Sequence, residues 1–481
     1  MKKIQAILTS SLLAAGTAFS ASLPNAASLA TEMKLGWNIG NTMEVTRSDG
    51  EADETYWGNP QITQTLIDSV KAAGFNVIRI PCAWSEHADA STYVISSTWM
   101  ARVKEVVDYC IKDSMFVILN AHWDNGWLQD SIGTSVNSTI TARQKSYWTQ
   151  IATEFKDYDR HLLFAGANEP AVTTSAQMTV LLSYYQTFVD AVRAVGGNNA
   201  TRTLIVQGPV TDIEKTYNLM NTLPTDTQTG YMMVEIHDYT PYQFTMMTAD
   251  ASWGNQFYYW GTGLHSSTDT DHNPTWGEET YIDSLFNLMK TKFVSKGYPV
   301  VIGEFGASIR TNLSGSVFTL HLTSVAHFDG YAARSGLARG LIPVYWDNGV
   351  YSTSSQGDNY KIIDRSNGAV TQQQIVDSLL AGAGLYKGWN ASTSTTASRA
   401  PAEASAIQVS AKTSAGTILL NIGNVSSAHA VTLYNLSGKA LRHFSGTQIQ
   451  SEMAFGKDLP QGMYILRIRT DSGNTSLNII K

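Results

Sequence analysis

The stretch LLFAGANEP, residues 162–170, joins a short apolar run to a glutamate and a proline. Leu162–Ala165 is apolar at consecutive positions, which is typical of a parallel β-strand that is covered on both faces. Glu169 follows the run closely, and a carboxylate at such a place is costly to bury unless another group pairs with it or uses it. Its role therefore depends on what other strands bring to the same place.

Seven further stretches share this apolar character and lie between helical patterns, from about residue 33 to 387. The eight strand candidates are KLGWNIG (34–40), NVIRIP (76–81), MFVILNAH (115–122), LLFAGANE (162–169), TLIVQG (203–208), MMVEIHDY (232–239), PVVIGEFG (299–306) and LIPVYWDNG (341–349). Helical patterns separate them, such as residues 60–74, where Pro60 suits the first turn and Gly74 the end. Eight βα repeats predict a (β/α)8 barrel, and an open doubly wound sheet is the alternative.

The two ends of the chain differ in composition from the barrel region. Residues 1–20 combine a Lys-Lys pair, an apolar stretch and small residues in a cleavage pattern, which predicts a signal peptide and an exported protein. Residues 388–406 are rich in Ser, Thr and Ala, which predicts a linker. Residues 407–481 alternate in short strands and turns, which predicts a small, sandwich-like all-β module.

The overall composition favours a neutral partner. The 481 residues carry 33 basic and 40 acidic side chains, so no basic field suggests nucleic acid or an anionic membrane surface. After the signal peptide, no segment approaches the ~20 apolar residues of a membrane span. Cys82 and Cys110 fall at opposite ends of one predicted βα unit, so we expect two free thiols. We expect a monomer.

Side chains suited to recognition and catalysis stand where the predicted strands end. In a (β/α)8 barrel these ends meet at one mouth, where the active site forms. They are Asn38, Asn41, Arg79, His122, Trp123, Asn168, Glu169, Gln207, His237, Tyr239, Glu304, Trp346, Asp347 and Asn348. A strand-to-loop transition favours Gly, Asn, Asp and Ser, so the Glu, Arg, His and Trp residues indicate function. Gln207 and Asp347 alone are compatible with ordinary strand ends.

Glu169 and Glu304 could face each other across this mouth. Two carboxylates that flank a bond are the requirement for glycoside hydrolysis. A separation of ~5–5.5 Å predicts double displacement through a covalent intermediate, and ~6.5–9.5 Å predicts direct attack by water. The alternative for Glu304 is a buried ion pair with Arg79 that has no catalytic role.

Two other enzyme classes are poorly supported by the motifs. His122 and His237 could be core or metal-binding residues, but no HExxH-like or Cys/His spacing accompanies them. No G-x-S-x-G elbow follows a predicted strand, which argues against a serine hydrolase. We expect no metal and no cofactor.

Eight short motifs occur in order over residues 33–387. They are GWNIGNTME (36–44), WGNP (57–60), IRIP (78–81), LNAHW (119–123), ANEP (167–170), IHDY (236–239), IGEFG (302–306) and VYWDNG (344–349). Together they resemble glycoside hydrolase family 5, the large cellulase-containing family of clan A. The resemblance implies a retaining mechanism, with Glu169 as the general acid/base and Glu304 as the nucleophile.

The resemblance also implies a substrate-binding set around the two glutamates. Its members are Asn41, Arg79, His122, Trp123, Asn168, His237, Tyr239 and Trp346. Asn168 corresponds to the residue that hydrogen-bonds the sugar 2-hydroxyl, and Arg79 and Tyr239 correspond to residues that hold the nucleophile. Trp346 corresponds to the platform beneath the sugar being cleaved. Many members have a second histidine where this chain has Trp123, so polar contacts on that side differ.

We expect the two glutamates to differ in ionisation. Arg79 near Glu304 should lower the pKa of this carboxyl, which favours an ionised nucleophile. A more apolar setting and a second negative charge should raise the pKa of Glu169, so that it keeps a proton. Each carboxylate would then take its role from its surroundings.

The resemblance favours a β-1,4-glucan that is cut internally, as by an endo-β-1,4-glucanase (cellulase). Mannan, xylan, xyloglucan and mixed-linkage glucan are alternatives that the fold does not separate. A polysaccharide-binding surface protein that kept the cleft is the non-catalytic alternative. The long segment 240–277 carries eight aromatic residues, of which we expect about half to bind sugars and half to form a small core.

The C-terminal module carries a second resemblance. Its stretches VTLYNLSGKALRHF (431–444) and LPQGMYILRIRTDSGNTSLNIIK (459–481) resemble the sorting domain of type IX secretion substrates. This implies a Gram-negative cell whose outer-membrane secretion machinery exports the protein to the cell surface or beyond, often removing the tail. A carbohydrate-binding module is the alternative, although the module has no Trp for an aromatic binding row.

Overall fold

The structure is a computed structural model. It describes residues 22–385 except 48, 51 and 351–358, and residues 409–480 except 415–416, 423–427, 436–439, 461–462 and 471–472. The predicted signal peptide and linker lie outside the described residues, so both stay predictions.

Eight parallel strands form a closed barrel in chain order, and β8 pairs with β1 to close it. The strands are β1 (Gly36–Asn38), β2 (Val77–Ile80), β3 (Phe116–Asn120), β4 (Leu162–Ala165), β5 (Leu204–Gln207), β6 (Met232–Asp238), β7 (Val300–Phe305) and β8 (Leu341–Tyr345). Each lies within a predicted stretch. The (β/α)8 barrel is therefore confirmed, and the open-sheet alternative is wrong.

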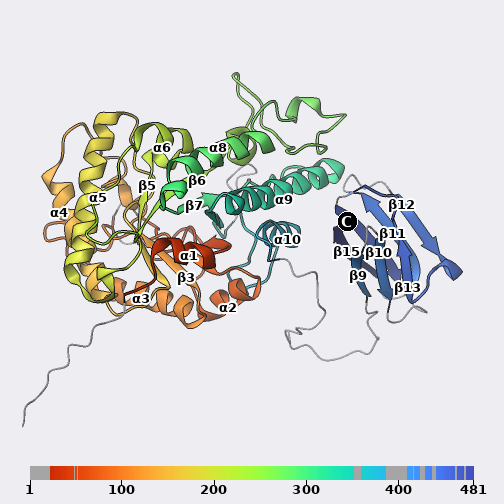
Figure 1. Ribbon diagram of the computed structural model, residues 1–481, viewed down its shortest axis with the longest axis horizontal. Coiled ribbons are helices and arrows are strands. Elements are labelled where there is room, and N and C mark those ends of the chain that lie inside the picture. Colours follow the sequence, from red (N-terminus) through yellow and green to blue (C-terminus); the bar gives the residue numbers. More distant parts are fainter. Residues whose placement is uncertain are drawn as a thin grey trace, which may run out of the picture.

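Helices surround the barrel (Figure 1). They are α1 (Ala26–Glu32), α2 (Gln64–Ala72), α3 (Ser97–Lys112), α4 (Ser138–Glu154), α5 (Ser175–Val195), α6 (Ile213–Leu219), α7 (Tyr242–Thr245), α8 (Glu279–Lys292), α9 (Gly315–Ala338) and α10 (Gln373–Gly382). The prediction that Pro60 lies in the first turn of α2 is wrong. Thr63 caps this helix by accepting a hydrogen bond from the amide of Leu66. Gly74, with a φ of 108°, follows its end as predicted.

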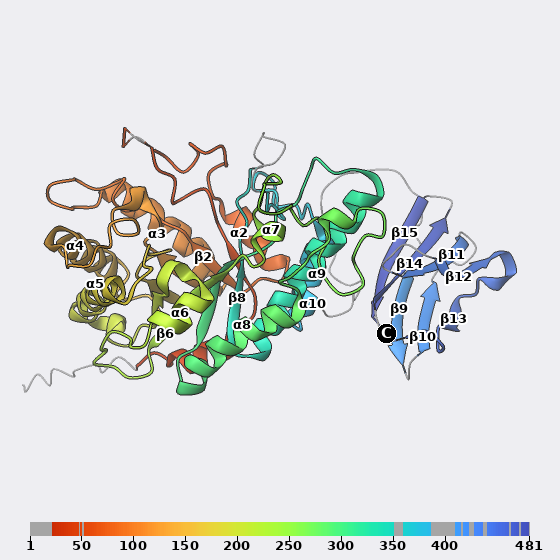
Figure 2. The ribbon, with the colours of Figure 1, turned by 90° about the horizontal axis from the view of Figure 1, so that it is seen from above.

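The inside of the barrel is a packed apolar core. Its strand residues are Val77, Phe116, Ile118, Leu163, Ala165, Ile205, Met233, Val301, Ile342 and Val344. Ala26 and Leu29 of α1, together with Met33 directly after the helix, are buried and close the N-terminal end of the barrel. In Figure 2 the red helix α1 and the short helix α7 lie at opposite ends of the strands. Only the C-terminal end is therefore open to polar side chains.

The C-terminal residues form two antiparallel sheets, with strand orders β13-β10-β9 and β12-β11-β14-β15. The strands are β9 (Val409–Ser414), β10 (Thr417–Ile422), β11 (Ala428–Asn435), β12 (Ala440–Ser445), β13 (Glu452–Phe455), β14 (Met463–Thr470) and β15 (Gly473–Ile480). Side chains of both sheets, such as Leu420, Leu433 and Leu466, are buried in one core. The predicted small all-β module is confirmed.

The structure also tests the predictions about free thiols and membrane spans. Cys82 and Cys110 are both buried and free, as predicted. Burial raises the pKa of both thiols, so neither is an activated nucleophile. Among the described helices, none combines the length and apolarity that crossing a bilayer requires.

Candidate active site

A layer of buried polar side chains lies inside the barrel, next to the apolar core at the C-terminal end. Its members, none of them exposed to solvent, are Asn38, Arg79, Asn120, Gln207 and Glu235. Side chains alternate along a strand, so Arg79 points inward like Val77, and Glu235 points inward like Met233. Polar groups at this depth need partners from other strands, because water cannot solvate them.

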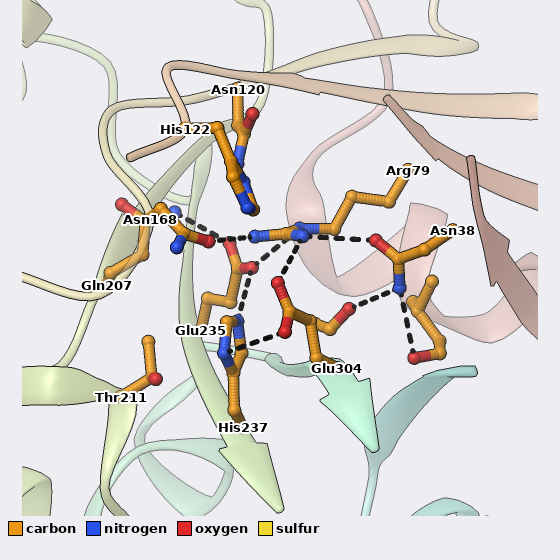
Figure 3. Close-up of polar contacts among 12 residues, drawn as sticks. Asn38, Arg79, Asn120, His122, Asn168, Gln207, Thr211, Glu235, His237 and Glu304 are labelled. Atoms are coloured by element: carbon orange, nitrogen blue, oxygen red, sulfur yellow. Dashed lines mark hydrogen bonds and ion pairs between the residues drawn. The ribbon is translucent and has the colours of Figure 1, made fainter. Parts of the chain in front are cut away.

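Arg79 is the centre of this layer (Figure 3). Its Nη1 donates to Glu304 Oε1 at 2.9 Å and to Asn38 Oδ1 at 3.0 Å, and its Nη2 donates to Asn168 Oδ1 at 2.8 Å. Its Nε lies 2.9 Å from Glu235 Oε1. A guanidinium presents its donors in a rigid fork, so Arg79 fixes the orientation of its three hydrogen-bonded partners, and it forms an ion pair with Glu235.

A β-bulge aims Glu304 into the barrel. Along β6 and β7, Ile236 pairs with Ile302, but the next pair is His237 with Glu304, which leaves Gly303 without a partner on β6. Because of this extra residue, Glu304 lies at a position from which it meets Arg79 and His237. A Cβ on Gly303 would lie 2.0 Å from Glu235 Oε1, so only glycine fits beside this carboxylate.

Glu169 and His237 form the second part of the site. His237 Nδ1 lies 2.7 Å from Glu169 Oε1 and 3.6 Å from Glu304 Oε2, so it stands between the two glutamates. Thr211 also donates a hydrogen bond to Glu169 Oε1, at 3.3 Å. One carboxylate oxygen of Glu169 and one of Glu304 come within 4.8 Å of each other. The structure therefore brings the two predicted carboxylates together over one gap.

Glu235 is a site residue that the sequence analysis missed. Its Oε1 meets Arg79 Nε and lies 3.3 Å from His237 Nε2, and its Oε2 accepts a hydrogen bond from Gln207 Nε2 at 2.6 Å. Two sequence signals could have identified it. An acidic residue interrupts the apolar strand β6, and it precedes His237 by two positions, which places both on the same face.

Most other predicted residues lie around the two glutamates. Tyr239 donates a hydrogen bond to Glu304 Oε2 at 3.1 Å. His122 lies parallel to Trp346, with ring centroids 6.1 Å apart, and its Nδ1 lies 3.1 Å from Asn120 Nδ2. An amide nitrogen only donates, so Nδ1 accepts and His122 presents its Nε2 proton.

Asn41 and Trp123 lie outside this network. The backbone amide of Asn41 donates to Glu44, and its carbonyl accepts from Asn59 Nδ2. Trp123 is 38% exposed, and its indole donates to Asp130 Oδ2 at 2.7 Å. In the described part of the chain, neither side chain hydrogen-bonds to a glutamate of the site, so their predicted role in substrate binding stays a prediction.

Gln207 and Asp347 have structural partners. Gln207 Oε1 accepts a hydrogen bond from the backbone amide of Ala167, and its Nε2 holds Glu235. Asp347 Oδ2 accepts backbone hydrogen bonds from Ile362 and Ile363, so it organises a loop after β8.

The pKa order expected for the two glutamates is wrong. Burial raises the pKa of Glu304, whose side chain is only 8% exposed, and the attraction of His237 and Arg79 does not reverse this. Burial also acts to raise the pKa of Glu169, but the hydrogen bond and the charge of His237 lower it overall. We attribute the difference to Glu235 and His237, which the sequence argument left out: Glu235 shares the charge of Arg79, and His237 pairs most closely with Glu169.

His237 is positively charged at neutral pH, and this charge lowers the pKa of Glu169. Burial alone would lower its pKa, but the carboxylates of Glu304, Glu169 and Glu235 raise it to about 9. The pair of Glu169 and His237 therefore holds one proton at neutral pH. This proton lies in the 2.7 Å hydrogen bond between His237 Nδ1 and Glu169 Oε1.

Glu169, His237 and Glu304 are also the one set of side chains in the described residues whose ligand atoms lie close enough to hold a metal ion. These atoms already contact one another, and Arg79 binds Glu304. A cation in this position would meet the positive charge of Arg79, so the donor set does not fit a metal centre.

Seven of the eight aromatic residues of segment 240–277 are either buried or exposed, and Tyr258 is half-buried and stacked on His272. Phe244, Phe257, Tyr259 and Trp260 are buried. Tyr242, Trp253 and Trp276 are 48%, 64% and 41% exposed, and the rings of Tyr242 and Trp253 lie 6.3 Å apart. Tyr242 is the first residue of α7, three residues after Tyr239 in the chain, and α7 lies at the same end of the barrel as the site (Figure 2).

A closed parallel barrel with two carboxylates facing each other at its C-terminal end has the fold and the paired acids of a barrel glycoside hydrolase. The family model described as "Cellulase (glycosyl hydrolase family 5)" matches residues 39–352. The chain therefore belongs to glycosyl hydrolase family 5 and is a glycoside hydrolase, as the eight motifs predicted.

Several known proteins are similar to the chain over about three quarters of its length. The chain is 35% identical over 366 residues to a xyloglucan-specific endo-β-1,4-glucanase of Bacteroides ovatus, which covers 74% of this chain and 69% of that protein. It is 35% identical over 378 residues to endoglucanase A of Paenibacillus barcinonensis, with 74% and 90% covered. A crystal structure of a family 5 xyloglucan-specific β-1,4-glucanase from a ruminal metagenomic library, in complex with XXLG, shares 44% identity and a TM-score of 0.68. It covers 75% of this chain and 97% of that one.

The contact at Gly303 yields a test of the site geometry. We expect Gly303→Ala to lower glycoside hydrolase activity on the order of 10²-fold, because the added methyl group displaces the Glu235 carboxylate from Arg79. Gly133→Ala is the matched control, because a Cβ there meets no atom within 4 Å. Steady-state kinetics of both variants would check this, and full activity of Gly303→Ala would show that the contact does not matter.

Proposed function

We propose that the protein is an exported, retaining endo-β-1,4-glucanase in which Glu169 is the general acid/base and Glu304 is the nucleophile. The approach of their carboxylate oxygens to within 4.8 Å is the observation that carries this proposal. Retaining glycosidases hold these groups ~5–5.5 Å apart, whereas inverting enzymes leave room for a water molecule.

In the first step, Glu304 attacks the anomeric carbon and the proton held by Glu169 and His237 passes to the glycosidic oxygen. A glycosyl ester forms on Glu304, and the C–O bond to the leaving sugar breaks. Arg79 and Tyr239 hold the two oxygens of Glu304 at 2.9 and 3.1 Å, so the carboxylate needs little reorientation before it attacks.

In the second step, Glu169 accepts a proton from water, and the water oxygen attacks the anomeric carbon from the face that the leaving group has vacated. The ester bond breaks, and Glu304 leaves as a carboxylate. Asn168 supports both steps in this mechanism. Its Oδ1 accepts from Arg79, and among the described residues its Nδ2 makes a single, 3.3 Å contact with Gln129, so this amide can donate to the sugar 2-hydroxyl.

The aromatic side chains supply the flat surfaces that a glucan chain needs. Trp346 lies parallel to His122, and we propose that it supports the sugar that is cleaved. Tyr242 and Trp253 are exposed and lie close to each other, and we propose that they bind further sugars of the same chain. Contacts on several consecutive sugars favour cleavage within a chain over cleavage at its end.

Relatives named endoglucanase and xyloglucan-specific endo-β-1,4-glucanase support a β-1,4-glucan backbone as the substrate. Xyloglucan is the second candidate, because the 44% identical structure is of a xyloglucan-specific enzyme. A panel of soluble cellulose, mixed-linkage glucan, xyloglucan, mannan and xylan, with product lengths recorded, would test the proposal.

We expect wild type to release oligosaccharides of mixed length from the glucans. Glu304→Gln should abolish release while it retains binding, and Glu169→Gln should lower kcat ~10²–10⁴-fold on unactivated substrates. Binding without release from every polymer by wild type would instead support a polysaccharide-binding protein, and an active Glu304→Gln would refute the nucleophile.

The pKa directions predict the pH profile of kcat/KM. Glu304 must be ionised to attack. Because burial raises its pKa, the acidic limb of the profile should have its midpoint at a pH above ~4.3, the ordinary pKa of a glutamate. The acid must keep its proton, and His237, whose pKa is raised to about 9, holds it, so activity should persist until the pH approaches 9. A profile that already falls between pH 6 and 7 would contradict this account.

We also propose that residues 407–481 serve in export across a Gram-negative outer membrane. The module has its own core, and its sequence resembles type IX sorting domains. Removal of these residues should leave kcat/KM unchanged and abolish release from the native cell. A fall in kcat/KM on insoluble cellulose, with release intact, would favour a carbohydrate-binding module.

A further inference from the structure

Glu235 contacts both cationic groups of the site with the same oxygen. Its Oε1 lies 2.9 Å from Arg79 Nε and 3.3 Å from His237 Nε2 (Figure 3). The side chain is fully buried, and Gln207 holds its other oxygen at 2.6 Å. It faces His237 on the side opposite Glu169, so it does not stand in the gap between Glu169 and Glu304.

The position of Glu235 decides which nitrogens of His237 carry protons. A carboxylate accepts hydrogen bonds and cannot donate when ionised, so Nε2 must carry a proton. If His237 is neutral, Nδ1 is then an acceptor, and Glu169 must donate its own proton to it. If His237 is charged, Nδ1 carries the proton and Glu169 accepts. Both arrangements keep one proton between Nδ1 and Glu169 Oε1, which lie 2.7 Å apart.

Glu235 also divides the charge of Arg79. Arg79 lies 2.9 Å from both Glu235 and Glu304, so its charge is not available to Glu304 alone. A buried Arg79 that faced Glu304 alone would stabilise the ionised nucleophile more strongly. A single carboxylate outside the reacting pair therefore influences both the acid and the nucleophile.

We propose that Glu235 is a positioning residue that holds the Nε2 proton of His237, and thereby keeps the catalytic proton on the hydrogen bond between His237 Nδ1 and Glu169. This goes beyond the proposed function, which assigns Glu235 no role. Because Glu235 adds a negative charge to the cluster, its removal lowers the pKa of every neighbouring group.

Several titratable groups from other elements face the same cluster. They are Arg79 from β2, His122 after β3, Glu169 after β4, Tyr185 from α5, Tyr239 after β6 and Glu304 from β7. Glu235→Gln leaves all of them in place and removes only one charge, with nearly the same volume.

The test is the titration of His237 by NMR in the full-length enzyme, assigned with a His237→Gln variant. In wild type, His237 should titrate near pH 9. In Glu235→Gln, we expect this titration to fall by at least about one pH unit, and both limbs of the kcat/KM profile to move in the acidic direction. Glu235→Asp keeps the negative charge but moves it away from His237, because the side chain is one methylene shorter. The pKa of His237 should therefore fall by less in this variant.

Asp238→Asn is the matched control, because Asp238 is a buried carboxylate of the same strand whose position faces the helices. It should leave the titration of His237 and both limbs in place. A folded Glu235→Gln with unmoved limbs and an unchanged titration of His237 would overturn the proposal, even if its kcat/KM were lower at every pH.

If Glu235→Gln does not fold, Glu235→Asp decides, and an unchanged titration of His237 in that variant overturns the proposal. The kinetic readout rests on the proposed function, but the NMR titration does not need turnover. A wild type that hydrolyses no glycan would therefore refute the proposed function and leave this inference to be decided by the titration.

Discussion

The burial of one guanidinium inside the barrel is the constraint on which the rest of the site depends. Arg79 has no exposure to solvent, and a cation at such depth is stable only with charged and hydrogen-bonding partners. The barrel supplies them from β1, β6, β7 and the end of β4. The same contacts that stabilise the buried charge also hold Glu304 and Asn168, so the geometry of the site is a consequence of the need to pair Arg79.

Residues that stabilise the fold and residues that take part in the reaction lie at opposite ends of the barrel axis. Helix α1 and the inward-facing apolar residues close the N-terminal end, while the polar layer begins one inward position further along the strands. Changes in the apolar core should therefore affect the free energy of unfolding more than the reaction, and changes in the polar layer should do the reverse. The bulge at Gly303 belongs to the polar layer. Its register shift brings Glu304 beside His237, and the missing side chain of Gly303 leaves room for the Glu235 carboxylate.

Much of this could be predicted from the sequence, because consecutive apolar runs identify buried parallel strands and the barrel rule places their ends together. Glu169, Glu304, Arg79, His237 and Tyr239 meet for that reason. The features that the sequence did not predict depend on contacts between strands. The shift in register at Gly303 is not visible in one strand alone, although a glycine within a strand is a signal of a bulge or a close approach. The pKa order also failed, because it required the distance of His237 to each glutamate and the presence of Glu235 beside Arg79.

The central claim is that two carboxylates this close, with one proton held by Glu169 and His237, act by double displacement. The most direct measurement is ¹H NMR of the anomeric protons during the first minutes of cello-oligosaccharide hydrolysis. The account predicts that the β-anomer appears first and the α-anomer only later, by mutarotation. Initial release of the α-anomer would mean that water attacks directly, which would contradict a covalent role for Glu304.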